Sequence, residues 1–453
     1  MARLSLCMIA RDEERFLAGA LASARGAVDE MIVVDTGSRD RTPQIAREHG
    51  ARVLEFPWCD DFAAARNHGL EAAAGTHILV LDADERLAGK PGPALRKALG
   101  DARLLFGMLA LHDADALDAP FEDVLSGKRR LQAPIWLPRL FRNDPRLRFE
   151  RRVHETLFLG IEEKRRALGG EFLAVDAPIV HLGEVKSLRA ELGKAQRNTR
   201  LLELALSENP ADGDLAGYLA VEYTRTNRWQ EAEALAARTL PLFLAELDRL
   251  PKEALKLSPI ALAGVLATAQ LRRGVPAEAL RSVREAAARC SEPHPNLIYL
   301  EGAAQARLGE LEAAEACMRA CLALDGKRFT IPVNHGMTGA AAKLQLANVL
   351  IAAGRAAEAL PLLEGLDGKY AQPAALARAE AIALEGRVPE ALALLRELSK
   401  NREPGAPLAA DLVALLSWTM ARVGMPDPRL VDALSKMPPS SWYEPRRREL
   451  ARG

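Results

Sequence analysis

The chain has 453 residues, of which 49% are hydrophobic and 27% charged, and its 61 basic residues balance 61 acidic ones. This length predicts two or three domains, and the composition excludes wholesale disorder and a protein that binds nucleic acid through an overall basic surface. The five scattered cysteines, without any C-x-x-C spacing, indicate neither a disulfide framework nor a zinc site.

The hydropathy of the sequence indicates the cellular compartment in which the protein is expected. No stretch approaches the roughly 18 to 20 apolar residues that a membrane span needs. The first residues lead directly into a strand-like segment, without the apolar core of a signal peptide. We therefore expect a cytoplasmic protein with no transmembrane segment and no nucleic-acid partner.

The first part of the chain alternates short β-branched runs with amphipathic segments. Strands are expected at residues 3–9, 31–34, 52–56 and 77–81. Between the second and third, a helix should begin with Thr42 as N-cap and Pro43 at its first position, and end just before Gly50. This order predicts an α/β, Rossmann-like domain with a mostly parallel sheet, in which ligands bind beyond the carboxyl ends of the strands.

The second part of the chain is rich in alanine and leucine and shows a repeat. Small residues stand seven positions before and five positions after each of five turn residues. The turn residues are Asn227, Gly274, Gly309, Gly354 and Gly386, preceded by Ala220, Ala267, Gly302, Ala347 and Ala379 and followed by Ala232, Ala279, Ala314, Ala359 and Ala391. Small side chains let two helices approach closely, and this spacing resembles the tetratricopeptide (TPR) repeat.

The change of pattern places a domain boundary near residue 185. We expect an α/β domain over residues 1–185 and an all-α, TPR-like helical solenoid over residues 186–453. Turns in the repeat are 47, 35, 45 and 32 residues apart, so inserted turns or lengthened helices are expected in some units. Gly424 lacks both small partners, which predicts an atypical terminal cap from about Pro407 to the end.

Carboxylates follow two of the predicted strands. Asp35 ends the strand at 31–34, and the strand at 77–81 runs into Asp82, Ala83 and Asp84. In an extended segment Asp82 and Asp84 project to the same side and can share a cation or a ribose hydroxyl. Their hard oxygen atoms suit Mg²⁺ or Mn²⁺ bridging the phosphates of a nucleotide, although Asp also favours turns after strands for purely structural reasons.

Several short motifs stand in the order and spacing that are typical of one protein family. They are residues 5–14, 34–38, 65–67, 81–84, 139–143, 153–155 and 179–181. Together they resemble glycosyltransferase family 2, which has the GT-A fold and in which helical repeats also occur behind the catalytic domain. The resemblance covers about the first 185 residues. Asp12 stands where the family often has Asn, and Thr36 replaces the second acid of the commoner turn after Asp35.

The resemblance implies a nucleotide-sugar site. Asp35 would contact the nucleobase or ribose, Arg66 the base or diphosphate, and Asp82 the ribose. Arg142, within the family-like segment at 139–143, would also bind the donor.

The resemblance further implies the metal ligands and the base. Asp84 would ligate Mn²⁺ or Mg²⁺, and His181 looks like the later histidine that completes coordination, or it is structural. Glu155 is the candidate for the base of an inverting reaction, or else an acceptor-binding residue. His154 would share the catalytic role or contact the diphosphate.

Two other segments carry charge. Nine basic residues against two acidic ones lie between Lys128 and Arg152, which predicts a solvated basic face or a site for the diphosphate or an anionic acceptor. The segment from His112 to Asp115 could imitate a second metal site, and we interpret it as a surface loop.

The sequence therefore favours a metal-dependent glycosyltransferase of the hexosyl or N-acetylhexosaminyl class. Its acceptor would be a protein, a peptide or a glycan, presented near the repeats, which could instead only form a homodimer. The alternative is a catalytically inactive scaffold that binds protein partners. A sugar nucleotidyltransferase is disfavoured, because residues 10–14 after the first strand contain no glycine to hold a phosphate.

Overall fold

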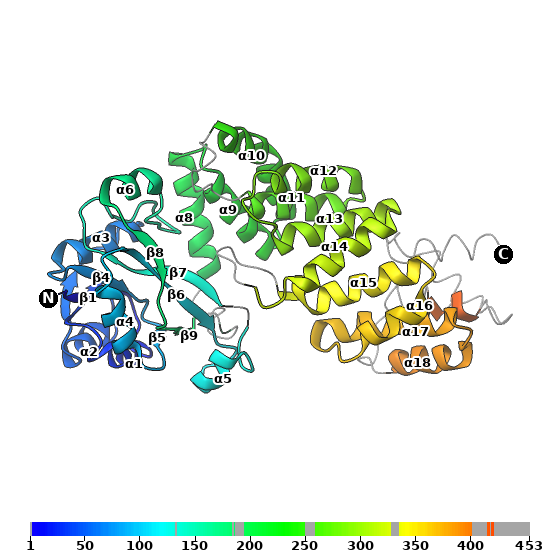
Figure 1. The fold of residues 1–453 in the computed structure, drawn as a ribbon, viewed down its shortest axis with the longest axis horizontal. Helices are drawn as coiled ribbons and strands as arrows, with labels where there is room; N and C mark the ends of the chain where they lie inside the picture. Colours follow the sequence, from blue (N-terminus) through cyan, green and yellow to red (C-terminus); the bar gives the residue numbers. More distant parts are fainter. Residues whose placement is uncertain are drawn as a thin grey trace. The chain divides into compact units, whose positions relative to one another are not determined.

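The computed structural model describes residues 2–131, 134–183, 185, 194–249, 259–327, 335–400, 415, 416 and 418–420 (Figure 1). The predicted terminal cap lies largely outside these residues. The segment in which we expect the domain boundary, next to residue 185, lies largely outside them as well.

One sheet of nine strands forms the first part of the molecule. Its order is β3-β2-β1-β4-β7-β6-β9-β5, with β8 paired to β6. The strands are β1 (Leu4–Ala10), β2 (Glu30–Asp35), β3 (Arg52–Glu55), β4 (His77–Val80), β5 (Glu85–Leu87), β6 (Leu104–Asp113), β7 (Ile135–Arg142), β8 (Glu171–Ala174) and β9 (Ile179–His181). The first four strands are parallel, as predicted, whereas β7 pairs antiparallel with β4 and β6 and β5 pairs antiparallel with β9, so the sheet is mixed.

Helices bury both faces of the sheet. They are α1 (Leu17–Ala24), α2 (Thr42–Glu48), α3 (Phe62–Ala72), α4 (Pro91–Leu99), α5 (Phe121–Ser126) and α6 (Ile161–Leu168). Leu21 of α1 belongs to one apolar cluster with Leu6 of β1, and Leu70 of α3 belongs to the other with Ile32 of β2. Burial of each such leucine stabilises the fold by about 1.5–3 kcal/mol. Strands β1, β2 and β4 are therefore apolar on both faces, as expected for parallel strands between two helical layers.

In the described residues from 194 onward, the secondary structure consists of helices (Figure 1). They are α8 (Lys194–Glu208), α9 (Gly213–Arg225), α10 (Trp229–Arg249), α11 (Ile260–Arg272), α12 (Pro276–Ala287), α13 (Pro295–Leu308), α14 (Leu311–Ala323), α15 (Ala340–Ala352), α16 (Ala356–Ala359), α17 (Ala371–Leu384) and α18 (Val388–Lys400). Short 3₁₀ segments are η1 (His335–Thr338), η2 (Leu360–Leu363) and η3 (Gly368–Tyr370).

The predicted repeat is confirmed. Each of the five turn residues has a positive φ, between 61° and 83°, and separates two helices: α9 from α10, α11 from α12, α13 from α14, α15 from α16 and α17 from α18. All nine alanines at the small positions are buried. At the tenth, a Cβ on Gly302 would lie 2.7 Å from Cβ of Cys317 on the paired helix, which shows why the helices need small residues there.

The helical part begins within the same compact unit as the sheet. The chain divides into two compact units between Leu262 and Ala263. Helices α8, α9 and α10 therefore belong to the unit that contains the sheet. At 21 residues α10 is the longest described helix of the repeats, which accounts for the long first spacing. The boundary at residue 185 marks where strands end and helices begin, and it stays a prediction as a domain boundary.

Two local predictions are wrong. Helix α2 has Arg41 as its N-cap, whereas the Thr42 hydroxyl accepts a hydrogen bond from Glu13 N at 2.7 Å. The segment from His112 is not a surface loop, because His112 and Asp113 end strand β6 and are buried.

We also compared the helices with the length and apolarity that a membrane span needs. None of the helices in the described ranges is both long and apolar enough to cross a bilayer.

Candidate functional site

The carboxyl ends of β1, β2 and β4 meet at one edge of the sheet. Ala10 at the end of β1 pairs with Asp35 at the end of β2, and Cys7 of β1 pairs with Val80 at the end of β4. Asp82 follows β4 by two residues. The parallel register therefore places Asp35 and Asp82 at the same edge, where ligands bind in sheets of this kind.

Asp35 is buried and is held by the turn that follows it. Ser38 donates to its carboxylate from the backbone N at 3.3 Å and from Oγ at 2.5 Å. The turn also holds the loop after β1, because Asp12 N donates to Ser38 Oγ at 3.0 Å and Asp12 Oδ1 accepts from Arg39 N at 2.7 Å. These bonds fix both loops at this edge of the sheet.

Arg66 joins two of the predicted site residues. It lies on α3, whose N-terminus is capped by Asp61 accepting a hydrogen bond from Ala64 N at 2.9 Å. Arg66 Nη2 donates to Asp82 Oδ1 at 2.8 Å, and Arg66 Nε donates to Glu155 Oε1 at 2.5 Å. The guanidinium thus brings Asp82 and Glu155 together from distant parts of the sequence.

Arg139 extends this chain of ion pairs on the other side of Asp82. Its Nη2 donates to Asp82 Oδ2 at 3.1 Å and also to Glu85 Oε1. The network therefore alternates in charge from Glu155 through Arg66, Asp82 and Arg139 to Glu85. Arg66 Nη1 and Arg139 Nε are buried and have no hydrogen-bond partner among the described residues. Buried donors of this kind normally have a partner, so both would need a ligand atom, or a movement of the surrounding side chains, to be satisfied.

The network controls the charge of its members. Burial alone would raise the pKa of Asp82, but the adjacent Arg66 and Arg139 hold it well below its usual range. Burial raises the pKa of Glu85 above its usual value, and the positive charge of Arg139 offsets only part of this effect. Asp82 is therefore deprotonated at neutral pH. Its negative charge balances the two arginines, and its oxygen atoms can accept hydrogen bonds from a donor.

Asp84, the residue before β5, lies close to His181 at the end of β9. Glu85 pairs with His181 across β5 and β9, and Leu182 N donates to Asp84 O at 3.0 Å. His181 Nε2 lies 3.7 Å from Asp84 Oδ1, while His181 Nδ1 and Asp113 Oδ1 are 2.7 Å apart. Burial would lower the pKa of His181, but hydrogen bonds to Asp113 and Asp84 raise it well above its usual value.

This pair of side chains fits a divalent cation. Once His181 is neutral, with its remaining proton on Nδ1 toward Asp113, Nε2 can face a cation as a ligand atom, which is the usual way that a carboxylate orients a metal-binding histidine. Gly183 keeps the space open, because a Cβ there would lie 2.1 Å from Asp84 Oδ2 and 2.7 Å from His181 Nε2. In the described part of the chain no three His, Cys, Asp or Glu residues form a complete metal site. Two protein ligands suit Mg²⁺ or Mn²⁺, which take further ligands from water and phosphate.

The structure does not bring Arg142 to this edge. Arg142 pairs with His77 at the start of β4, whereas Leu140 pairs with Leu79, so Arg142 is displaced toward the opposite end of the sheet from Asp82. Its guanidinium donates to the carbonyl groups of Ala102 at 2.8 Å and Leu104 at 2.6 Å. Arg142 therefore stabilises neighbouring backbone, and our expectation that it contacts the donor does not fit this geometry.

His154 also points elsewhere. Its ring stacks on Tyr218 of α9, with ring centroids 3.8 Å apart and planes inclined by 2°. Burial lowers the pKa of His154 to about 4, and Arg225 and Arg151 lower it further in the same direction. A neutral histidine that packs on a helix does not favour the diphosphate contact, whereas a catalytic role for His154 stays a prediction.

The basic segment from Lys128 to Arg152 is not a free positive face. Three of its members pair with nearby acids, as Arg129 does with Asp115 at 2.9 Å and Arg146 with Asp144 at 2.8 Å. Arg151 and Arg152 instead pair with acids of the first helices. Apart from Arg139, the segment therefore contributes structure and not an open anion site.

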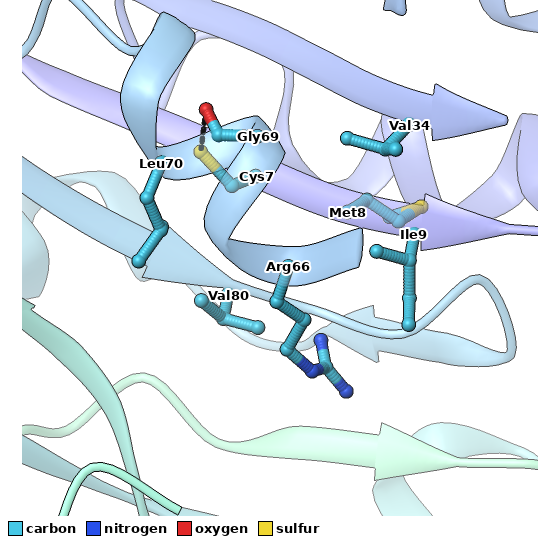
Figure 2. Close-up of a pocket in the computed structure, with 8 residues that line it drawn as sticks. All are labelled: Cys7, Met8, Ile9, Val34, Arg66, Gly69, Leu70 and Val80. Carbon is cyan, nitrogen blue, oxygen red and sulfur yellow. Dashed lines mark hydrogen bonds between the residues drawn. The ribbon is translucent and has the colours of Figure 1, made fainter. Parts of the chain in front are cut away.

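A narrow apolar cavity lies beside the site. It is too narrow to hold a water molecule and is lined by Cys7, Met8, Ile9, Val34, Arg66, Gly69, Leu70 and Val80. Figure 2 shows the Cys7 thiol directed at the Gly69 carbonyl and the Arg66 side chain extending away from them. Burial raises the pKa of the Cys7 thiol to about 12, so Cys7 is inert. The cavity lies under α3 and not at the edge that holds the carboxylates.

Sequence reasoning missed three members of the site. Glu85 directly follows the Asp82–Asp84 pair and could have been included as its third acid. Asp113 ends a long apolar run, residues 104–111, which is the pattern of a buried strand. Gly183 gives no signal on its own, because its importance depends on the side chains that face it.

Known proteins resemble separate parts of the chain. Residues 5–120 match the family model for glycosyl transferase family 2. The chain is similar to a TPR repeat-containing protein of Synechococcus elongatus, with 39% identity over 223 residues, 48% of this chain and 52% of the relative. An uncharacterized glycosyltransferase of Rickettsia felis is 35% identical over 88 residues, 19% of this chain and 31% of that protein. The chain thus spans about half or less of the length of these relatives.

A solved structure was also found, glucosyl-3-phosphoglycerate synthase of Mycobacterium tuberculosis with Mn²⁺, uridine diphosphate and glucosyl-3-phosphoglycerate. It has 18% sequence identity and a TM-score of 0.30, over 46% of this chain and 79% of that one. From the family match at residues 5–120 and the confirmed repeat, the chain carries a glycosyl transferase family 2 domain of GT-A type at its N-terminus, followed by TPR-like helical repeats.

Proposed function

We propose that this protein transfers a sugar from a nucleotide-sugar donor to an acceptor. The observation that carries the proposal is the meeting of Asp35, Arg66, Asp82 and Asp84 at one edge of the sheet. These residues come from separate segments, and nothing in the packing of a sheet requires acids and a buried arginine to gather there. The match of residues 5–120 to glycosyl transferase family 2 supports the same function.

The donor would bind across this edge. Asp35, buried and held by Ser38, would accept hydrogen bonds from the base or ribose, and Asp82 would contact the ribose. Arg66 has a buried Nη1 without a partner among the described residues, and this donor suits a phosphate oxygen. Arg142 has no part in this proposal, since its donors are used by carbonyl groups.

Asp84 and His181 would hold Mn²⁺ or Mg²⁺, with the remaining ligands from water and the diphosphate. When bound, the cation would stabilise the negative charge that develops on the leaving diphosphate. Asp113 would keep His181 Nε2 directed at the cation, and His181 would have to lose the proton that Asp84 and Asp113 favour in the metal-free site.

Glu155 would act as the base. As the acceptor oxygen attacks the anomeric carbon, the bond from that carbon to the diphosphate breaks and the Glu155 carboxylate takes the acceptor proton. Attack from the face opposite the leaving group would invert the anomeric centre. Only Glu155 Oε1 is bonded to Arg66, so Oε2 can face the acceptor.

The acceptor class is proposed from the repeats. Concave surfaces of TPR-like solenoids suit extended peptides, so we propose a protein or peptide acceptor, with a glycan or a homodimer contact as the alternatives.

A donor screen tests the function. Purified protein with Mn²⁺ or Mg²⁺ would be incubated with a panel of uridine- and guanosine-diphosphate sugars, and release of the nucleoside diphosphate measured. We expect release from one donor and none from the Asp84→Ala variant. Binding of protein partners with no release from any donor would instead favour a catalytically inactive scaffold.

A further inference from the structure

The loop that carries Glu155 has an unusual backbone. Arg151 and His154 both have left-handed conformations, with φ of 76° and 51°. Such conformations cost about 1–3 kcal/mol each in residues other than glycine, and they persist only where surrounding contacts impose them. The contacts that impose them therefore determine where Glu155 lies.

The base of the loop is closed and tied to α3. Glu150 and Thr156 form an antiparallel bridge, with N to O distances of 2.9 and 3.0 Å. Phe62 N, at the start of α3, donates to Arg152 O at 2.8 Å. One side of the loop is thus joined to the helix that carries Arg66, the partner of Glu155.

The other side of the loop is held by α9, the first helix of the first repeat pair. Arg151 Nη2 donates to Asp212 Oδ1 at 2.9 Å and to Asp214 Oδ2 at 3.4 Å. Asp212 is also the N-cap of α9, accepting from Asp214 N and Leu215 N. Both Arg151 and Asp212 side chains are less than a tenth exposed, so removal of either partner would leave a buried charge.

Tyr218 contacts the residue that precedes Glu155. It lies one helical turn after Asp214, and its ring is parallel to the ring of His154, the residue immediately before Glu155. Tyr218 is still 42% exposed, so it belongs to a surface junction and not to the core of the helical repeat. A substitution there should leave the repeat folded.

We propose that Tyr218 of α9 is a positioning residue for the transfer reaction, acting through His154 to hold Glu155 beside Arg66. The inference rests on the proposed role of Glu155. It makes the first helical pair part of the catalytic unit, whereas the sequence suggested only a role in presenting the acceptor or in dimerisation.

The test uses the full chain and four variants. Tyr218→Ala removes the stack, Tyr218→Phe retains the ring, and Glu155→Gln removes the proposed base. Arg200→Ala is the matched control, because Arg200 of α8 pairs with Asp60 at the same junction in an exposed ion pair that includes neither His154 nor Glu155. The probes are Mn²⁺, uridine and guanosine diphosphates for binding by calorimetry, and the donor panel described above for turnover.

We expect Tyr218→Ala to lower kcat about 10- to 100-fold, since a displacement of about 1 Å at a reacting group has effects of this size. The Kd for the nucleoside diphosphate and the melting temperature should stay close to wild type. Tyr218→Phe should restore turnover, and Arg200→Ala should leave it unchanged.

Other outcomes separate the two proposals. Wild-type turnover in Tyr218→Ala, together with an inactive Glu155→Gln variant, would overturn the positioning role alone. An equal loss in Tyr218→Ala and Arg200→Ala would also overturn it, because any loosening of the junction would then suffice. Full turnover in Glu155→Gln would overturn the proposed role of Glu155, on which the inference depends.

Discussion

The imidazole of His181 and the carboxylate of Asp113 are 2.7 Å apart, on paired positions of β9 and β6. This contact fixes the orientation of the ring and leaves Nε2 directed at Asp84. The sheet register, and not the spacing of acids along the chain, therefore builds the candidate cation site. Single substitutions can test the contribution of each residue to this site.

Asp113→Asn should weaken Mn²⁺ binding about 10- to 100-fold, because an amide orients the imidazole less well than a carboxylate and lowers its basicity. Calorimetric titration with Mn²⁺ in the presence of a nucleoside diphosphate measures the change. Asp115→Asn is the control, since Asp115 pairs with Arg129 on the same segment without contacting His181. Unchanged Mn²⁺ affinity in Asp113→Asn would show that His181 is not a ligand.

Gly183→Ala should abolish metal-dependent nucleotide binding. The added Cβ would lie 2.1 Å from Asp84 Oδ2, so either the carboxylate or the backbone must move. Gly92→Ala is a matched control, because its Cβ would meet its nearest neighbours at ordinary contact distances of 3.9 and 4.0 Å. Wild-type binding by Gly183→Ala at an unchanged melting temperature would mean that the cation does not need this space.

Glu155→Gln should lower turnover by at least about 100-fold and leave nucleotide affinity within a few-fold of wild type. The amide keeps the size of the side chain and can still accept a hydrogen bond from Arg66, but it cannot take a proton. Steady-state kinetics and calorimetry on the same preparations separate the two effects. A parallel loss of binding and turnover would assign Glu155 to donor binding.

Acid should destabilise the junction at His154. Its pKa is lowered to about 4 by burial and then by Arg225 and Arg151, so the unfolded chain takes up a proton at higher pH than the folded protein does. This contribution to stability is complete above about pH 6.5 and is lost as the pH falls toward 4, in total on the order of 3 kcal/mol. His154→Phe, which keeps an aromatic ring on Tyr218, should lose less stability between pH 7 and pH 5 in urea denaturation. Identical losses in both proteins would contradict this explanation.

Local patterns along the chain predicted most of the fold. The four parallel strands lie within one residue of their predicted limits at either end; for β1, β2 and β4 the signal is the apolar run of a strand buried on both faces, whereas β3 is only partly buried. The five turn residues were identified from the small residues around them, and all have the left-handed backbone that ends a helix. Such signals are local, so one sequence suffices to detect them.

The site could be predicted only in part, because its remaining contacts join distant segments. Asp35, Arg66 and Asp82 were found from strand ends and family motifs. Arg142 was misplaced since the same motif holds two arginines three positions apart, of which only Arg139 reaches Asp82. The stacking of His154 on Tyr218 depends on how a helix packs against a loop, and neither residue carries a sign of it in the sequence.

The most direct test of the central claim is calorimetric titration of the wild-type protein and Asp84→Ala with uridine and guanosine diphosphates, with and without Mn²⁺. We predict saturable binding of one nucleotide by the wild type that requires Mn²⁺ and is absent from the variant. Binding that is equal with and without the metal, or equal in the two proteins, would contradict a donor site built on Asp84.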